Sequence, residues 1–258
     1  MSRTWVVLVG LLSLMSACVP SETRVKRERA SASYYGLGVA HLNENQIQQA
    51  YIEFQKAVEA DPKSKDAHYA LGHVHFQKEN YTDAIAAFRK ALALDPGYSD
   101  AHNYLGKVHE SQGRMDDAIA EYQMALSNPQ YETPQKPHLN LGLIYLRQNR
   151  HQEAAAAFGK ALRIDPGNYM ARSGLGRAYL SVGKIKEAIA EYEEAARLAP
   201  EDPDVHYDLG EAYLKGEAHA LAAAAIEKAV ALSPQDPRAS DARARLDALR
   251  GTQGRRSP

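Results

Sequence analysis

The dipeptide Leu-Gly recurs at a nearly constant interval along most of this chain of 258 residues. Its six copies begin at Leu37, Leu71, Leu105, Leu141, Leu175 and Leu209. Successive copies lie 34 residues apart, except that 36 residues separate the third from the fourth. A fixed period of this length is the signature of a repeat architecture, in which each unit packs only against its neighbours. The period therefore constrains the fold more than any single motif does.

Each copy of the period carries the same pattern of small and large residues after its glycine. An alanine follows 12 residues after the glycine, a large residue comes four positions later, and a second alanine comes three positions after that. In the first unit these residues are Ala50, Phe54 and Ala57. Intervals of four and three place side chains on one face of a helix. Because small residues let two helices approach closely and the large residue fills the gap, we expect a packed helix pair in each unit.

Turn residues separate the two expected helices, and prolines end the second one. Glycine or asparagine stands near the middle of four units, where a residue able to adopt a positive φ ends the first helix. These residues are Asn45, Gly113, Asn149 and Gly183. Prolines close five of the six units, and proline prevents a helix from continuing. They are Pro62, Pro96, Pro166, Pro200 and Pro234.

The combined pattern resembles the tetratricopeptide repeat, in six copies over residues 31–235. The resemblance implies an all-α superhelical solenoid of about thirteen helices. The expected repeats are 31–64, 65–98, 99–134, 135–168, 169–202 and 203–235. We expect a capping helix over residues 236–250, because its apolar residues recur at intervals of three and four and the last repeat must cover an apolar side. Residues 251–258 are expected to be a disordered tail.

The first 30 residues differ from the repeats. Residues 5–17 form an uncharged apolar run that is too short to span a bilayer, which needs about 20 residues, but that is typical of a secretory signal peptide. The run ends in small residues before Cys18, the only cysteine of the chain. This segment resembles the lipobox of bacterial lipoproteins, so residues 1–17 are expected to be removed and Cys18 to carry a covalent lipid. Residues 18–30 are charge-dense and are expected to form the lipidated N-terminus and a flexible linker.

The lipobox resemblance also implies a location. Lipidation of this kind adds several acyl chains, and two or more chains anchor a protein stably to a membrane. In bacterial lipoproteins an aspartate after the cysteine tends to retain the protein in the inner membrane, and Val19 stands there instead. The expected location is therefore the outer membrane, on its periplasmic side. A plain signal peptide with an incidental cysteine, or a buried N-terminal helix, remains the alternative.

The sequence offers no motif for catalysis or for nucleic-acid binding. A net charge of −1 gives no electrostatic case for nucleic acid, and a lone cysteine excludes an intrachain disulfide framework and a thiolate zinc cluster. The closest histidine cluster is His68, His73 and His75, but His68 and His75 occupy positions that tyrosine fills in other repeats, so packing explains both. We expect no enzymatic activity, no metal, no cofactor other than the lipid on Cys18, and no small-molecule substrate.

The first helix of each repeat is expected to line a concave groove that binds a protein partner. The groove-facing positions of the tetratricopeptide repeat fall on Tyr35, Val39, Tyr69, His73, Phe76, Asn103, Lys107, Asn140, Leu143, Arg147 and Arg177. The first two units present apolar and aromatic residues, and the middle units turn polar and basic. A peptide or amphipathic helix with apolar and acidic residues would fit this order. For Phe76 and Leu143 especially, packing between neighbouring repeats stays open as the alternative.

The long interval between the third and fourth units supplies a second resemblance. Residues 127–142 contain three prolines and, taken alone, are interpreted as a tolerated surface insertion. Together with the lipobox and the segment "HNYLG" at residues 102–106, this insertion resembles the pilotin lipoproteins of type IV pili. The matching positions are Asn103, Tyr104, Pro129, Tyr131, Pro134, Asn140 and Gly142.

The pilotin resemblance implies a function. Such a protein binds secretin subunits in the periplasm, and its lipid brings them to the outer membrane, where they multimerise into the ring through which the pilus passes. Tethering both partners to one membrane raises their effective concentration without any new contact. Two alternatives stay open, namely a lipoprotein scaffold for an envelope polysaccharide-export or cell-wall enzyme complex, and a subunit of a larger cytoplasmic assembly.

The Cys18→Ser variant is expected to keep the fold and to misplace the secretin, because serine offers no thiol for the lipid. Cell fractionation should find the variant outside the membrane fraction, with the circular dichroism spectrum of the original protein. An intact mass of the native protein that still includes residues 1–17 would contradict this expectation.

Overall fold

The computed structural model describes residues 22–237 and 244–245. Residues 22–237 form twelve α-helices and no strand, which confirms the expected all-α architecture. In chain order they are α2 (Glu22–Asn43), α3 (Ile47–Ala60), α4 (Lys65–Gln77), α5 (Tyr81–Leu94), α6 (Ser99–Ser111), α7 (Met115–Leu126), α8 (Gln135–Arg147), α9 (His151–Ile164), α10 (Tyr169–Ser181), α11 (Ile185–Leu198), α12 (Pro203–Lys215) and α13 (His219–Leu232). None of these described helices is both long enough and apolar enough to cross a bilayer.

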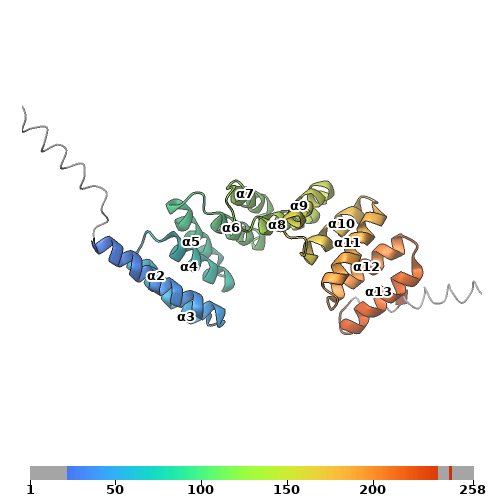
Figure 1. The fold of residues 1–258 in the computed structure, drawn as a ribbon, viewed down its shortest axis with the longest axis horizontal. Coiled ribbons are helices and arrows are strands. Elements are labelled where there is room, and N and C mark those ends of the chain that lie inside the picture. Colours follow the sequence, from blue (N-terminus) through green and yellow to red (C-terminus); the bar gives the residue numbers. More distant parts are fainter. Residues whose placement is uncertain (1–21, 238–243, 246–258) are drawn as a thin grey trace, which may run out of the picture. The chain divides into compact units, whose positions relative to one another are not determined.

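The helices belong to two compact units, residues 1–112 and 113–258. The described part of the first unit holds α2 to α6, and that of the second unit holds α7 to α13 (Figure 1). Within each unit, the two helices of a repeat pack against each other, as α4 does with α5 and α8 with α9, and consecutive repeats then pack through neighbouring helices. The boundary between the units falls at the turn of the third expected repeat.

The repeated large residues and alanines form the core of each unit. The large residues are at most 1% exposed, and they are Phe54, Phe88, Tyr122, Phe158, Tyr192 and Ile226. Both alanines of each repeat are fully buried. Burying one large apolar side chain stabilises a fold by about 1.5–3 kcal/mol, so a row of equivalent residues accounts for the regular packing that the sequence pattern predicts.

The glycines of five Leu-Gly pairs, Gly38, Gly72, Gly142, Gly176 and Gly210, make room for the large residue of their own repeat. A Cβ placed on Gly72 would lie 2.7 Å from ring atoms of Phe88, and one placed on Gly142 would lie 2.6 Å from Phe158. A Cβ on Gly38 would overlap the ring of Phe54 in the same way. Only glycine lets the two helices come this close, which explains why the period is most visible at this residue.

The turn between the helices of a repeat requires a residue with positive φ. The four residues predicted to supply it have φ values from 57° to 77°, and they are Asn45, Gly113, Asn149 and Gly183. Glu79 and Glu217 occupy the same position in the second and sixth repeats, with φ of 58° and 57°. Glutamate does not favour this conformation, which costs roughly 1–2 kcal/mol. Packing of the flanking helices therefore imposes the turn even where the residue resists it.

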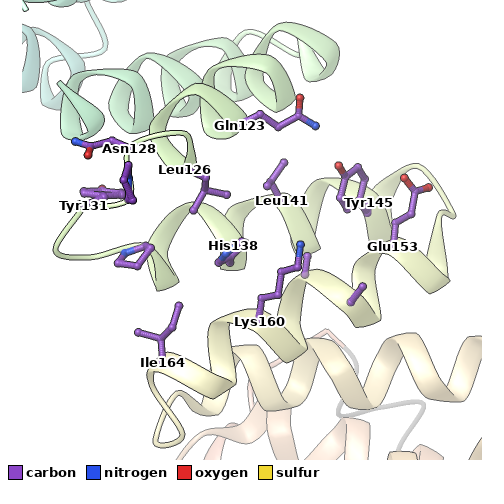
Figure 2. Close-up of a pocket in the computed structure, with 14 residues that line it drawn as sticks. Gln123, Leu126, Asn128, Tyr131, His138, Leu141, Tyr145, Glu153, Lys160 and Ile164 are labelled. Carbon is purple, nitrogen blue, oxygen red and sulfur yellow. The ribbon is translucent and has the colours of Figure 1, made fainter. Parts of the chain in front are cut away.

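Residues 127–134 connect α7 to α8 and contain the two residues that lengthen the period. Asn128 organises the connection, because its carbonyl accepts a hydrogen bond from the backbone of Tyr131 at 3.2 Å and its side chain accepts one from Gln130 at 3.0 Å. Pro134 precedes the first residue of α8. Asn128 and Tyr131 are drawn in Figure 2, on the segment that joins the two helices.

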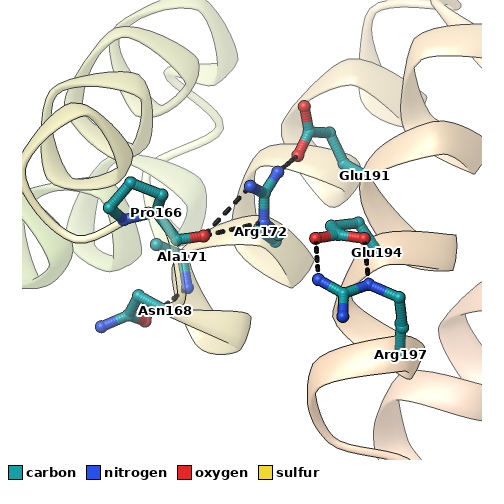
Figure 3. A network of polar contacts seen from close by, with 7 residues as sticks. All are labelled: Pro166, Asn168, Ala171, Arg172, Glu191, Glu194 and Arg197. Carbon is teal, nitrogen blue, oxygen red and sulfur yellow. Dashed lines mark hydrogen bonds and ion pairs between the residues drawn. The ribbon is translucent and has the colours of Figure 1, made fainter.

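A side chain early in the first helix of several repeats binds the proline carbonyl that precedes it. The ring Nε2 of His68, His102 and His206 lies 2.9–3.1 Å from the carbonyl oxygen of the proline six residues earlier. In the fifth repeat Arg172 takes this position, and its guanidinium donates to the Pro166 carbonyl and to Glu191 (Figure 3). In these four repeats the side chain attaches the first helix to the turn before it, which is more than the packing role expected for His68.

The structure differs from the expected linker, because residues 22–30 are helical and form the first part of α2. Two ion pairs at a spacing of four residues support this part, with Lys26–Glu22 at 2.7 Å and Arg24–Glu28 at 2.8 Å. Each such pair stabilises a helix by about 0.2–0.5 kcal/mol. Since the packed repeat already nucleates α2, extending it requires only these small contributions.

Other predicted segments lie outside the described residues. These are the signal peptide 1–17 with Cys18, and the tail 251–258. Of the expected capping helix 236–250, residues 244–245 are helical, and Arg245 forms an ion pair with Glu211 of α12.

Substituting the two glycines of α2 is expected to have opposite effects on stability. Gly38→Ala should lower the free energy of unfolding by about 1–3 kcal/mol, because the new methyl group overlaps Phe54. Gly36→Ala should raise it by about 0.5–1 kcal/mol, because no atom lies within 4 Å of the new Cβ and alanine favours the helix. Urea unfolding of both variants checks the expectation, and a change in the same direction for both would contradict it.

Candidate functional site

Helices α4 and α6 of the first unit bring together four rings, Tyr69, His73, Phe76 and Tyr104, which we call the aromatic cluster. The first three lie on α4 at i, i+4 and i+7 and so share one face. The ring of Tyr104 lies 5.7 Å from Tyr69, 4.9 Å from His73 and 6.1 Å from Phe76, between centroids. The interplanar angles of 74–85° give the edge-to-face arrangement that aromatic pairs prefer. All four side chains are half-buried, so each retains an accessible part.

The aromatic cluster packs against the core of the first unit. Tyr104 stacks on the fully buried Phe88 at 5.9 Å and 26°, and Tyr69 lies 5.9 Å from the same ring. Tyr98 packs 5.2 Å from Tyr69 and donates a hydrogen bond to Asp66 at 2.8 Å. Burial and the neighbouring Asp66 carboxylate both raise the pKa of Tyr98, which keeps its hydroxyl protonated as the donor. The cluster is therefore held in place before any partner arrives.

A positive charge lies beside the aromatic cluster. The ammonium group of Lys107, on α6, is 5.0 Å from the ring centre of Tyr104 and 5.4 Å from that of Phe76. These distances are within the range of cation–π attraction. Burial, and then the charge of Lys107, lower the pKa of His73 from its ordinary value of 6.5. At neutral pH the cluster thus combines apolar rings, a neutral imidazole and one cation.

The other predicted groove residues of the first unit have two different environments. Tyr35 and Val39 are half-buried on α2 and pack against the core around Phe54, with the ring of Tyr35 5.7 Å from that of Phe54. Asn103 differs from the expectation, because only 2% of it is exposed. Its side chain therefore does not line an accessible surface. The five predicted residues of the first two repeats, Tyr35, Val39, Tyr69, His73 and Phe76, are all half-buried, and their role as a partner surface stays a prediction.

The predicted residues of the second unit lie on α8 and α10. Leu143 packs against the core cluster that contains Ile144 and Leu175, which is the packing alternative left open above. Arg177 forms an ion pair with Asp208 at 2.7 Å, so part of the expected basic character is neutralised. Asn140 is half-buried, and Arg147 is exposed. Within the second unit, these residues form no aromatic cluster like that of α4 and α6.

The histidines of the repeats do not assemble into a metal site in the part of the chain that the structure describes. Within residues 22–237 and 244–245, no group of three or more His, Cys, Asp or Glu side chains is placed to hold a metal ion. His73 faces Tyr104, whereas His68 binds the Pro62 carbonyl. The ring of His75 lies 5.4 Å from that of Tyr51, so the three histidines of the closest sequence cluster have separate contacts.

Tyr104 is the residue of the aromatic cluster that the groove pattern missed. The equivalent positions in the first two repeats are Gly36 and Ala70, so the repeat pattern gives no reason to expect a large side chain there. The available signal was the exception itself, an aromatic residue at a position where the first two repeats have glycine and alanine.

The Lys107→Gln variant is expected to raise the pKa of His73 toward its ordinary value, because it removes one of the two causes of the lowering and leaves burial in place. Since folding favours the neutral imidazole, stability is lost as the pH falls from 6.5 through the lowered pKa, and this loss should shrink in the variant. NMR titration of the His73 ring protons measures both proteins. Lys90→Gln on α5 is the control, and an unchanged His73 pKa in Lys107→Gln would contradict the geometry.

Comparison with known proteins agrees with the repeat pattern. Models of the tetratricopeptide repeat match residues 31–64, 69–137, 145–195 and 173–237. No curated protein matches the chain. Among solved structures, PilF of Pseudomonas aeruginosa superimposes with a TM-score of 0.78 at 24% identity, covering 84% of this chain and 98% of PilF.

Two further structures share the fold. PilW, described as a widely conserved type IV pilus biogenesis factor, has a TM-score of 0.74 at 20% identity and covers 82% of this chain and 97% of PilW. A chain of the Cut9–Hcn1 hetero-tetramer of the APC/C has a TM-score of 0.71 at 23% identity and covers 85% of this chain, but only 42% of its own length is matched. At these identities the likeness is one of fold, and fold alone does not define function. The chain belongs to the tetratricopeptide repeat family.

Proposed function

We propose that this protein is a pilotin, an outer-membrane lipoprotein that binds secretin subunits and assists their localisation and multimerisation in type IV pilus biogenesis. The observation that carries the proposal is the aromatic cluster on α4 and α6, with Lys107 at its side. A tetratricopeptide repeat protein acts as a scaffold for protein partners, and this cluster presents half-buried aromatic rings that are already packed on Phe88.

The aromatic cluster has the properties of a binding hot spot. Its rings are already ordered by contacts with one another and with Phe88, so a partner does not have to immobilise them on binding. Aromatic residues carry a large share of the binding energy at protein interfaces. Lys107 adds a charge that favours an acidic residue of the partner. The expected ligand is a secretin segment with apolar residues next to an acidic one.

Two further observations support the pilotin role. The fold matches PilF and the type IV pilus biogenesis factor PilW over nearly their whole length. The N-terminal sequence resembles a lipobox, with Cys18 as the lipid acceptor. A lipid on Cys18 would confine the protein and its bound secretin to one membrane, which raises the local concentration of subunits. In this account the protein acts by holding its partner and not by chemical catalysis.

The fraction of heat-resistant secretin multimer in outer-membrane preparations tests the proposal. Deleting the gene should convert multimer to monomer, and the original gene should restore it. Lys107→Glu should fail to restore it, with at least about a tenfold loss of multimer, because the reversed charge repels an acidic partner beside the rings. Lys90→Glu, on the second helix of a repeat, should restore multimer fully.

The outcomes separate two functions. Lost multimer with monomer remaining, in both the deletion and Lys107→Glu, is the result that the pilotin proposal requires. Multimer that is unchanged by the deletion would contradict it and would favour the alternative of a repeat lipoprotein that scaffolds an envelope polysaccharide-export or cell-wall enzyme complex.

A further inference from the structure

A pocket of about 640 Å³ lies in the second unit, around the irregular connection between α7 and α8 (Figure 2). Residues from three helices and from the connection line it, among them Leu126, Tyr131, His138, Leu141, Lys160 and Ile164. Sites that hold drug-sized ligands occupy about 300–1,000 Å³. The connection that builds one wall is the segment with two more residues than the regular period, so the pocket is a product of the insertion.

The insertion changes the role of His138. The equivalent residues His68, His102 and His206 each bind the proline carbonyl six residues earlier. Six residues before His138 stands Glu132, and among the described residues His138 has no such carbonyl partner. Its imidazole lines the pocket instead. A side chain that fastens the helix in other repeats is therefore available to a ligand in this one.

Lys160 supplies a positive charge to the same pocket. Figure 2 shows its side chain reaching from α9 across the pocket toward α8. Within the described part of the chain, Lys160 takes part in no ion pair and no hydrogen bond. The acidic residue of the lining, Glu153, is already paired with Arg150 at 2.5 Å and does not neutralise Lys160. Burial, and then the charges of Lys160 and Arg163, lower the pKa of His138, so the positive potential reaches the imidazole.

The rest of the lining is apolar or aromatic. Leu126 and Leu141 border the pocket, and Ile164 at its margin is 47% exposed. Tyr131 and Tyr145 add two rings. A cation and an imidazole beside such surfaces complement a carboxylate that is flanked by apolar side chains.

We propose that this pocket binds a peptide segment of a partner protein in which an acidic side chain stands next to apolar ones. The carboxylate accepts hydrogen bonds from the ammonium group of Lys160 and from the ring N–H of His138. A neighbouring apolar side chain of the peptide contacts Leu126, Leu141 and Ile164. This site is separate from the aromatic cluster of the first unit, and it does not depend on the identity of the partner proposed for that cluster.

NMR titration of the full chain tests the proposal with a blocked peptide, Ac-Tyr-Leu-Glu-Leu-NH₂, in which glutamate is the only charge. Its twin has glutamine instead of glutamate. The acidic peptide is expected to shift the His138 ring signals in a saturable way at millimolar concentration. Lys160→Gln and the glutamine twin should each weaken this binding by about tenfold, the loss expected for one charge-assisted hydrogen bond. Lys90 stands at the same position of the second repeat, so Lys90→Gln is the matched control and should bind like the original protein.

Three results would overturn the proposal. The first is the absence of any shift at His138 with millimolar acidic peptide. The second is equal binding of the glutamate and glutamine peptides, or binding of the acidic peptide by Lys160→Gln as tightly as by the original protein. Either outcome would mean that the contact between Lys160 and the carboxylate contributes nothing to binding. The third is a set of shifts confined to Tyr69, His73 and Phe76, which would assign the peptide to the aromatic cluster. Lys160 and Lys90 are both exposed, so neither variant removes a core contact.

Discussion

The close contact between a glycine of the first helix and a large residue of the second determines the geometry of these repeats. In the second repeat it joins Gly72 to Phe88, and the same Phe88 ring stacks under Tyr104 and contacts Tyr69. One buried side chain therefore sets the distance between α4 and α5 and also supports the aromatic cluster. A change at Gly72 would disturb the proposed partner surface, although this glycine has no side chain to offer a partner.

Residues at the repeated positions form the core. Residues that depart from the repeat pattern, in contrast, form the two surfaces proposed to bind partners. Tyr104 stands where the first two repeats have Gly36 and Ala70, and it completes the aromatic cluster. The longer connection before α8 leaves His138 without the proline carbonyl that its equivalents bind. In both places a repeated structural position gains a different role because its surroundings, or its residue, break the pattern.

Much of the fold could be predicted because it depends on periodic residues. The buried phenylalanines, the alanines and the positive φ of Asn45 and Gly113 all follow from positions that recur at 34 residues. The helical start of α2 could not be found in this way, since local ion pairs such as Lys26–Glu22 leave no apolar periodicity. The burial of Asn103 escaped the same reasoning, because a polar residue at a groove position gives no sign of how deeply its neighbours cover it.

If the protein is a pilotin as proposed, the aromatic cluster of the first unit contacts the secretin. A photoreactive phenylalanine analogue in place of Phe76, activated by light in cells that assemble pili, tests this contact directly. We expect a covalent adduct of this protein with the secretin subunit, and a much weaker one when the analogue replaces the exposed Met124 of α7. An adduct with the secretin from Met124 but not from Phe76 would show that the secretin does not bind at the aromatic cluster.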